Sequence, residues 1–69
     1  MKLSAKNILK GKVKALELGA VNAEVVIEIA GGVEITSVIT RESAEALGLA
    51  VGGTAYAVIK ASNVMVGVD

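Results

Sequence analysis

Residues 23–39, AEVVIEI-AGG-VEITSVI, decide the fold. In the first seven residues apolar side chains recur at every second position, and this period of two predicts a half-buried strand. Gly31 and Gly32 follow, and adjacent glycines accept positive φ, which favours a tight hairpin. The period of two then resumes over Val33–Ile39, so the stretch predicts two antiparallel strands.

The flanking sequence predicts three further strands and one short helix. Lys10–Leu18 alternates imperfectly, so it predicts a strand of uncertain register, followed by a turn at Gly19–Asn22. Beyond the hairpin, Thr40 is a good helix cap, residues 41–47 are helix formers, and Gly48 predicts the helix end, with Ala44 and Leu47 facing the core. Thr54–Lys60 and Val64–Val68 predict the last two strands. This order predicts an all-β fold, a small OB-like five-stranded barrel with one short helix.

The size and composition predict one domain, residues 1–69, that relies on self-association. A chain of 69 residues buries only about 60% of its unfolded surface, which leaves a monomer marginally stable. Disulfides and histidine or cysteine zinc sites are excluded because the chain contains neither residue type. The chain is nevertheless 54% hydrophobic, with Tyr56 as its one aromatic residue. Oligomerisation remains as the expected source of stability.

Charge is segregated along the chain although the formal net charge is zero. Residues 1–14 contain five of the seven basic residues and no acid, whereas residues 15–69 contain all seven acids. A basic arm on an acidic body predicts an anionic partner or contact with a neighbouring subunit, and the alternative is a solvated strand face. The longest uncharged stretch, Ala46–Ile59, is too short to span a membrane, and no signal peptide precedes it. We therefore expect a cytoplasmic protein with no membrane partner.

Catalysis and nucleic-acid binding are both disfavoured. Without histidine or cysteine there is no Ser-His-Asp or Cys-His pair, so we expect no enzyme. Asp69 is the only aspartate, and no carboxylate cluster suits a divalent cation, so no metal-ligand site is expected. A single aromatic residue offers little base stacking, and the acidic body opposes phosphate contacts. No nucleic-acid partner is therefore expected, although a nucleic-acid-binding OB-like domain remains an alternative.

Two short polar segments stand out as candidate anion-binding elements. SAKN (residues 4–7) and KASN (residues 60–63) each combine a lysine, a serine, an asparagine and a small alanine. Backbone N–H groups in such irregular stretches are not committed to a sheet, and lysine and serine add further donors. Together they can form an anion-binding concavity. The alternative is that both segments are polar turns without a ligand.

The chain also resembles the molbindins, or Mop proteins, in four segments taken in order. Residues 4–13 resemble the family opening SARN-x-(L/F)-x-G-x-V, with Lys6 where arginine is common. A backbone donor at that position survives this change, but a guanidinium contact does not. The other similar segments are GAVNAEV (19–25), ITSVIT with ESA and LGL (35–49), and VIKASNVM (58–65). The match covers nearly the whole chain at the length of a single molybdenum-pterin-binding, TOBE-like domain.

The resemblance implies a fold, an assembly and a ligand. It implies OB-like barrels that form strand-exchanged dimers, three of which make a homo-hexamer. It implies cytoplasmic binding of molybdate or tungstate, with no organic cofactor, for storage and homeostasis. A purely structural oligomerisation module remains an alternative.

The resemblance also implies the residues that hold the oxyanion at subunit interfaces. The principal set joins the two polar segments and comprises Ser4, Ala5, Lys6, Asn7, Lys60, Ala61 and Ser62. In this set Lys60 supplies the counter-charge, and hydroxyl and backbone N–H groups supply hydrogen bonds. A partner subunit or a second site is expected to use Gly19, Ala20, Val21, Asn22, Thr36 and Ser37.

Overall fold

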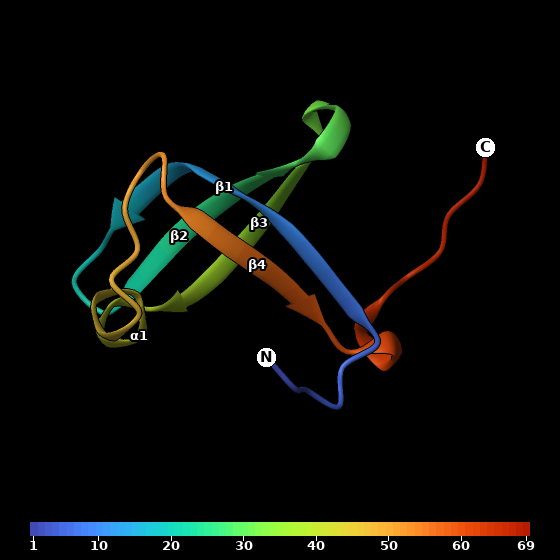
Figure 1. Cartoon of the computed structure of the whole chain (residues 1–69), viewed down its shortest axis with the longest axis horizontal. Coiled ribbons are helices and arrows are strands. Elements are labelled where there is room, and N and C mark those ends of the chain that lie inside the picture. Colours follow the sequence, from blue (N-terminus) through green and yellow to red (C-terminus); the bar gives the residue numbers. More distant parts are fainter.

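A computed structural model describes all 69 residues and shows one curled, antiparallel sheet with a short helix at one end (Figure 1). The sheet order is β3-β2-β1-β4. Its strands are β1 (Asn7–Leu18), β2 (Asn22–Ile29), β3 (Glu34–Thr40) and β4 (Thr54–Ile59). The helix α1 spans Arg41–Ala46, and two single 3-10 turns, η1 and η2, span Ala30–Gly32 and Ala61–Asn63. The predicted all-β fold with one short helix is confirmed, and the chain forms a curled four-stranded half-barrel where a five-stranded barrel was expected.

Strand β1 is the long strand around which the sheet curls. Its first half pairs with β4, and its second half pairs with β2, with Gly11 and Lys12 taking part in both pairings. A β-carbon at Gly11 would lie 2.4 Å from the Glu28 carbonyl oxygen, so only glycine lets the two backbones approach this closely. A register shift between Val13 and Ala15 explains the imperfect alternation of this stretch in the sequence.

The β2–β3 hairpin and the small core follow the predicted pattern. Gly31 and Gly32 have φ of 82° and 78°, as a tight connection requires. The alternating residues of β2 point to the concave face, where Val25 and Ile27 are buried. They pack with Val13 of β1 and Ala57 of β4 to form the core cluster. The predicted hairpin and the predicted alternation of buried residues along β2 are therefore confirmed.

Helix α1 begins as the sequence predicts but places one residue differently. The Thr40 hydroxyl accepts a hydrogen bond from the Ser43 backbone N–H at 3.0 Å, which caps the first turn. Ala44 is buried, as expected. Leu47 was expected in the core, but its side chain is 70% exposed because the helix ends one residue earlier. It lies instead at the rim of an apolar groove of about 370 Å³ along the concave face.

The carboxyl-terminal segment does not form the fifth predicted strand within this chain. Residues 64–69 run away from the sheet without a strand partner (Figure 1). Met65 and Val68 are 95% exposed, although their sequence is apolar. An apolar strand requires a sheet edge with which to pair, and this segment contacts none here. None of the helices has the length and hydropathy to span a membrane.

Candidate functional site

The two polar segments singled out in the sequence lie together at one end of the sheet. β1 and β4 are antiparallel, and their outermost pair joins Asn7 to Ile59. Residues 4–6 lead into β1 and residues 60–62 follow β4, so the two segments meet where these strands end (Figure 1). Fifty-two residues separate Asn7 from Ile59 in sequence, and the sheet alone brings them together.

A side-chain hydrogen bond ties the strands at this end. The Asn7 Nδ2 group donates to the Ile59 carbonyl oxygen at 3.2 Å. Asn7 is half-buried and occupies the strand face that also carries Leu9 and Val13. Its amide therefore finds its hydrogen-bond partner at an otherwise apolar position, as buried polar groups generally must.

Beyond this tie the segments offer unused hydrogen-bond donors. The backbone N–H groups of Ala5, Lys6, Ala61 and Ser62 make no hydrogen bond within the chain. The η2 turn is closed only by Asn63 N–H donating to the Lys60 carbonyl at 2.8 Å and Val64 N–H donating to the Ala61 carbonyl at 3.2 Å. Ser4, Lys6 and residues 60–62 are all exposed. Free N–H groups and exposed hydroxyls on two adjacent segments can converge on an anion.

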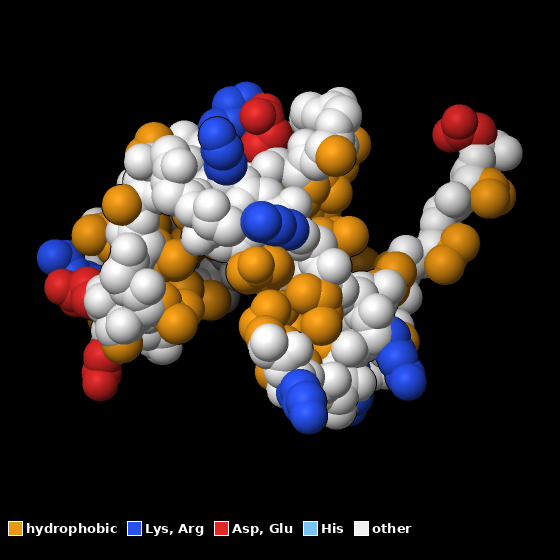
Figure 2. All heavy atoms as spheres, in the orientation of Figure 1, with side chains coloured by type: hydrophobic (Ala, Val, Ile, Leu, Met, Phe, Trp, Pro, Cys, Tyr) orange, Lys and Arg blue, Asp and Glu red, His pale blue; other side chains and the backbone are white.

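The electrostatics of this end favour a negatively charged ligand. All ion pairs of the chain are made by Lys14 and Arg41, so Lys6 and Lys60 have no carboxylate partner. The nearest residues along both segments include no acid. Figure 2 shows blue side chains without red neighbours at the end that carries η2 and the chain start. Both ammonium groups are therefore free to attract an anion.

Lys14 differs from these lysines because it is neutralised within the chain. Its ammonium group donates to a Glu34 carboxylate oxygen and lies 3.7 Å from Glu28. The hydrogen bond with Glu34 and the two nearby negative charges raise the pKa of Lys14 above its ordinary value. This group links β1 to the β2–β3 hairpin and is not available to a ligand.

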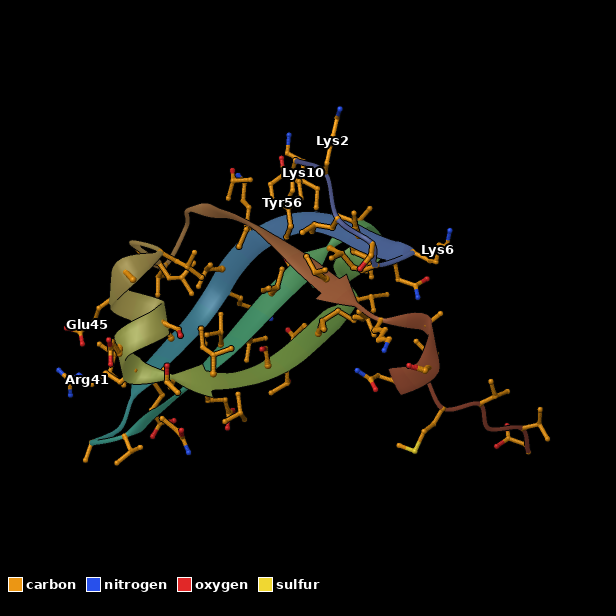
Figure 3. All side chains as sticks on the ribbon, turned by 90° about the horizontal axis from the view of Figure 1, so that it is seen from below. Lys2, Lys6, Lys10, Arg41, Glu45 and Tyr56 are labelled. Carbon is orange, nitrogen blue, oxygen red and sulfur yellow. The ribbon has the colours of Figure 1, made fainter.

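The second predicted region lies at the opposite end of the sheet. The Gly19–Asn22 turn joins β1 to β2 beside α1, and Figure 3 shows Lys6 far from Arg41 and Glu45. Arg41 holds the turn, because its backbone N–H donates to Val21 O at 2.8 Å and its Nη1 donates to Gly19 O at 3.3 Å. The Arg41 guanidinium also lies 3.4 Å from a Glu45 oxygen.

The hollow beside this turn is less suited to a dianion than the first region. It measures about 350 Å³, and its lining residues are Ala20, Val21, Thr40, Arg41, Glu42 and Glu45. Two carboxylates and one guanidinium give this lining a net negative charge. Sequence reasoning did not single out Arg41. The pairing of Asn22 with Thr40 in the sheet places residue 41 beside the turn, so Arg41 would have been found only if this strand register had been known.

Thr36 and Ser37 are not brought to the first region within one chain. They lie on β3, at the sheet edge opposite to β4, and pair with Val26 and Val25. Strands β2 and β1 separate them from the Asn7–Ile59 end. These two residues can join the principal set only when a second subunit presents them.

Comparison with protein families identifies a match over most of the chain. Residues 3–66 match the TOBE domain. A probable molybdenum-pterin-binding protein of Haemophilus influenzae is 52% identical over 69 residues, covering both chains completely. Molybdenum-pterin-binding protein 1 of Clostridium pasteurianum is 53% identical over 66 residues, covering 96% of this chain and 97% of its own.

Solved structures show the same likeness. MopII from Clostridium pasteurianum superposes with a TM-score of 0.92 at 51% identity, covering 97% of this chain and all of its own. The cytoplasmic molybdate-binding protein ModG, solved with molybdate bound, gives a TM-score of 0.95 at 58% identity. All of this chain is covered in that match, and it spans about half of ModG, 49%.

Proposed function

Because the chain belongs to the TOBE-domain family and, within it, to the molybdenum-pterin-binding (Mop) proteins, we propose that it binds molybdate at the basic end of its sheet. The observation that carries this proposal is the meeting of residues 4–7 and 60–62, with free N–H groups and two unpaired lysines. The molybdate-bound ModG, at 58% identity, supports the choice of ligand. Tungstate has nearly the same shape and charge and is expected to bind the same groups.

The chemistry required by the ligand matches the groups present. Molybdate is a tetrahedral dianion near neutral pH, so its binding site needs several donors and no carboxylate. We assign hydrogen bonds to the Ser4 hydroxyl and to the backbone N–H groups of Lys6 and, on the other segment, Ala61 or Ser62. The Lys60 ammonium supplies the counter-charge. Surrounding dipoles spread the remaining negative charge, as in backbone anion nests.

The site is completed by a second subunit in this proposal. All the principal residues except Ala5 and Asn7 are exposed in the single chain, so one chain alone does not enclose an ion. Thr36 and Ser37, or the Gly19–Asn22 turn, of a neighbouring subunit would close the open side. The bare apolar segment that follows Asn63 and the groove on the concave face support self-association. We propose strand-exchanged dimers that assemble into a hexamer.

The biological role that fits a small binding protein is storage and homeostasis of molybdate in the cytoplasm. Residues 1–69 act in this proposal as a single Mop domain, and binding rather than catalysis is the activity. The competing function is a structural oligomerisation module, which the bare apolar segment equally supports. The two differ only in whether the assembled protein has affinity for the oxyanion.

Calorimetric titration with molybdate tests the proposal directly. Lys60→Ala removes the counter-charge, and loss of a charge-assisted hydrogen bond is expected to weaken binding about 10- to 100-fold. Lys12→Ala is the matched control, because Lys12 is exposed and has no ion pair, and it pairs with Thr54 at the end of β4 opposite to Ile59. It should bind as the wild-type protein does. An assembled wild-type protein without molybdate affinity would instead favour the structural module.

A further inference from the structure

We propose that Asn7 is a specificity-determining positioning residue, whose side-chain amide fixes the distance between the two halves of the oxyanion site. The inference rests on the proposed function and concerns its selectivity for large oxyanions. Asn7 acts in it through the Ile59 carbonyl, rather than by contact of its side chain with the ion.

At this end the two halves of the site are connected only by the last backbone pair of the β1–β4 ladder and by the Asn7 side chain. Asn7 and Ile59 form the last backbone pair of β1 and β4. No hydrogen bond joins residues 4–6 to residues 60–62. The bond from Asn7 Nδ2 to Ile59 O, at 3.2 Å, is therefore the outermost tie before the segments separate. Lys60 directly follows Ile59 in the chain. The Asn7–Ile59 hydrogen bond therefore helps to fix the position of the Lys60 backbone, from which the charged side chain extends.

The edge position of β4 makes this tie more important. β4 is the last strand of the sheet and pairs only with β1. Its chain then leaves the sheet through η2, whose residues are all exposed. Strand ends fray when few buried contacts hold them, so the carboxyl end of β4 depends on its bonds to the start of β1.

The face on which Asn7 lies indicates a specific role for its amide. Asn7 shares the inward strand face with Leu9 and Val13, where an apolar residue would continue the pattern. A polar residue at a half-buried position costs free energy unless it is hydrogen-bonded, and here the Ile59 carbonyl meets that need. An apolar residue would fill the position without such a directed bond.

A fixed distance between the halves has a consequence for ion selection. Sulfate is also a tetrahedral dianion, so charge alone does not distinguish it from the larger molybdate. Discrimination then requires donors held at a separation that a smaller ion cannot span, since specificity is a difference between two affinities. When the Asn7–Ile59 hydrogen bond is lost, the two segments can approach each other and enclose the smaller sulfate ion. Loss of Asn7 is thus expected to lower selectivity as well as affinity.

The test compares molybdate and sulfate binding by calorimetry in the assembled wild-type protein and in Asn7→Ala and Asn7→Leu. Leu is close to Asn in size but has no donor, so it separates the hydrogen bond from the packing. We expect molybdate affinity to fall about 10-fold, as for loss of one well-placed hydrogen bond, while sulfate affinity falls less. The molybdate-to-sulfate affinity ratio should therefore decrease in both variants. Asn63→Ala is the matched control, because Asn63 lies in η2 and its side chain makes no hydrogen bond.

The possible outcomes separate the inference from the proposed function. Wild-type protein that binds no molybdate overturns both. Wild-type binding with an unchanged affinity ratio in a folded Asn7→Ala or Asn7→Leu protein overturns the inference alone. A ratio that falls equally in Asn63→Ala also overturns it, because the effect would then belong to the loop in general. If one variant fails to fold, the other decides, since melting curves identify the folded protein.

Discussion

Lys60 and Lys14 show how two identical side chains acquire different roles from their neighbours. Lys14 faces two carboxylates across the sheet, whereas Lys60 follows a strand end where no carboxylate is near. The sequence indicated the two polar segments, residues 4–7 and 60–63, as candidate anion-binding elements by their residue types, and the family resemblance assigned the site to them. It did not predict the Asn7 bond or the role of Arg41, because both depend on strand register. Register depends on pairings with residues far away in the chain, which local patterns do not contain.

A residue-scale prediction concerns the pH dependence of the Lys14 cluster. The folded-state pKa of Lys14 is raised by Glu34 and Glu28. A raised lysine pKa stabilises the fold below the unfolded-state pKa, and this contribution is lost as pH rises through the folded value. Lys14→Met should therefore melt slightly below wild type near neutral pH, and the difference should shrink at pH values above the ordinary lysine pKa of 10.5. Thermal melts by circular dichroism measure this, and an equal difference at all pH values would contradict it.

At the scale of secondary-structure elements, the alternation of apolar residues predicted the hairpin well, and the Thr40 cap with the helix formers after it predicted the helix. Both are local structures, fixed by Gly31 and Gly32 in one case and by the Thr40 cap in the other. The start of β1 was predicted three residues too late, at Lys10 rather than Asn7. Residues 7–9 form part of the strand because β4 pairs with them. Their own sequence does not indicate this pairing, because the partner residues are about 50 positions away in the chain.

Gly11 allows an element-scale prediction. Gly11→Ala would place a β-carbon 2.4 Å from the Glu28 carbonyl oxygen and 2.8 Å from Ile27 Cγ2, so the β1–β2 pairing must shift. We expect a loss of about 1–3 kcal/mol, comparable to overpacking in a core. Lys12→Ala is the control, since Lys12 is the next residue on the same strand and its side chain is exposed. Chemical denaturation of both variants measures the free energies, and equal stability would show that the sheet curl does not require glycine.

At the scale of the whole molecule, the single chain has a small core and a large apolar surface. Only six of its 69 residues are buried, and each is Val, Ile or Ala. The composition predicted this large apolar surface, because 54% of the chain is hydrophobic. The predicted fifth strand, Val64–Val68, is also missing from the single chain. An isolated chain gives the segment no partner strand, and a single sequence does not reveal whether such a strand pairs within its own chain or with another.

Ligand binding should be visible in the stability of the whole assembly. A ligand that binds only the folded protein raises the melting temperature by mass action, and 100 Kd of free ligand contributes about 2.7 kcal/mol. Saturating molybdate should therefore raise the melting temperature by several degrees, and sulfate at the same concentration should raise it less. Differential scanning calorimetry measures both shifts. Equal melting temperatures with and without molybdate would argue against binding to the folded assembly.

The bare tail after Asn63 also affects how the protein matures. Met65, Val66 and Val68 have almost no cover within their own chain, so in the proposed strand-exchanged dimer they become protected only when two copies associate. Completion of the fold then becomes a second-order event, whose half-time shortens as the copies accumulate. In such a dimer, freshly made molecules at low abundance would spend longest with an exposed, apolar and protease-accessible end.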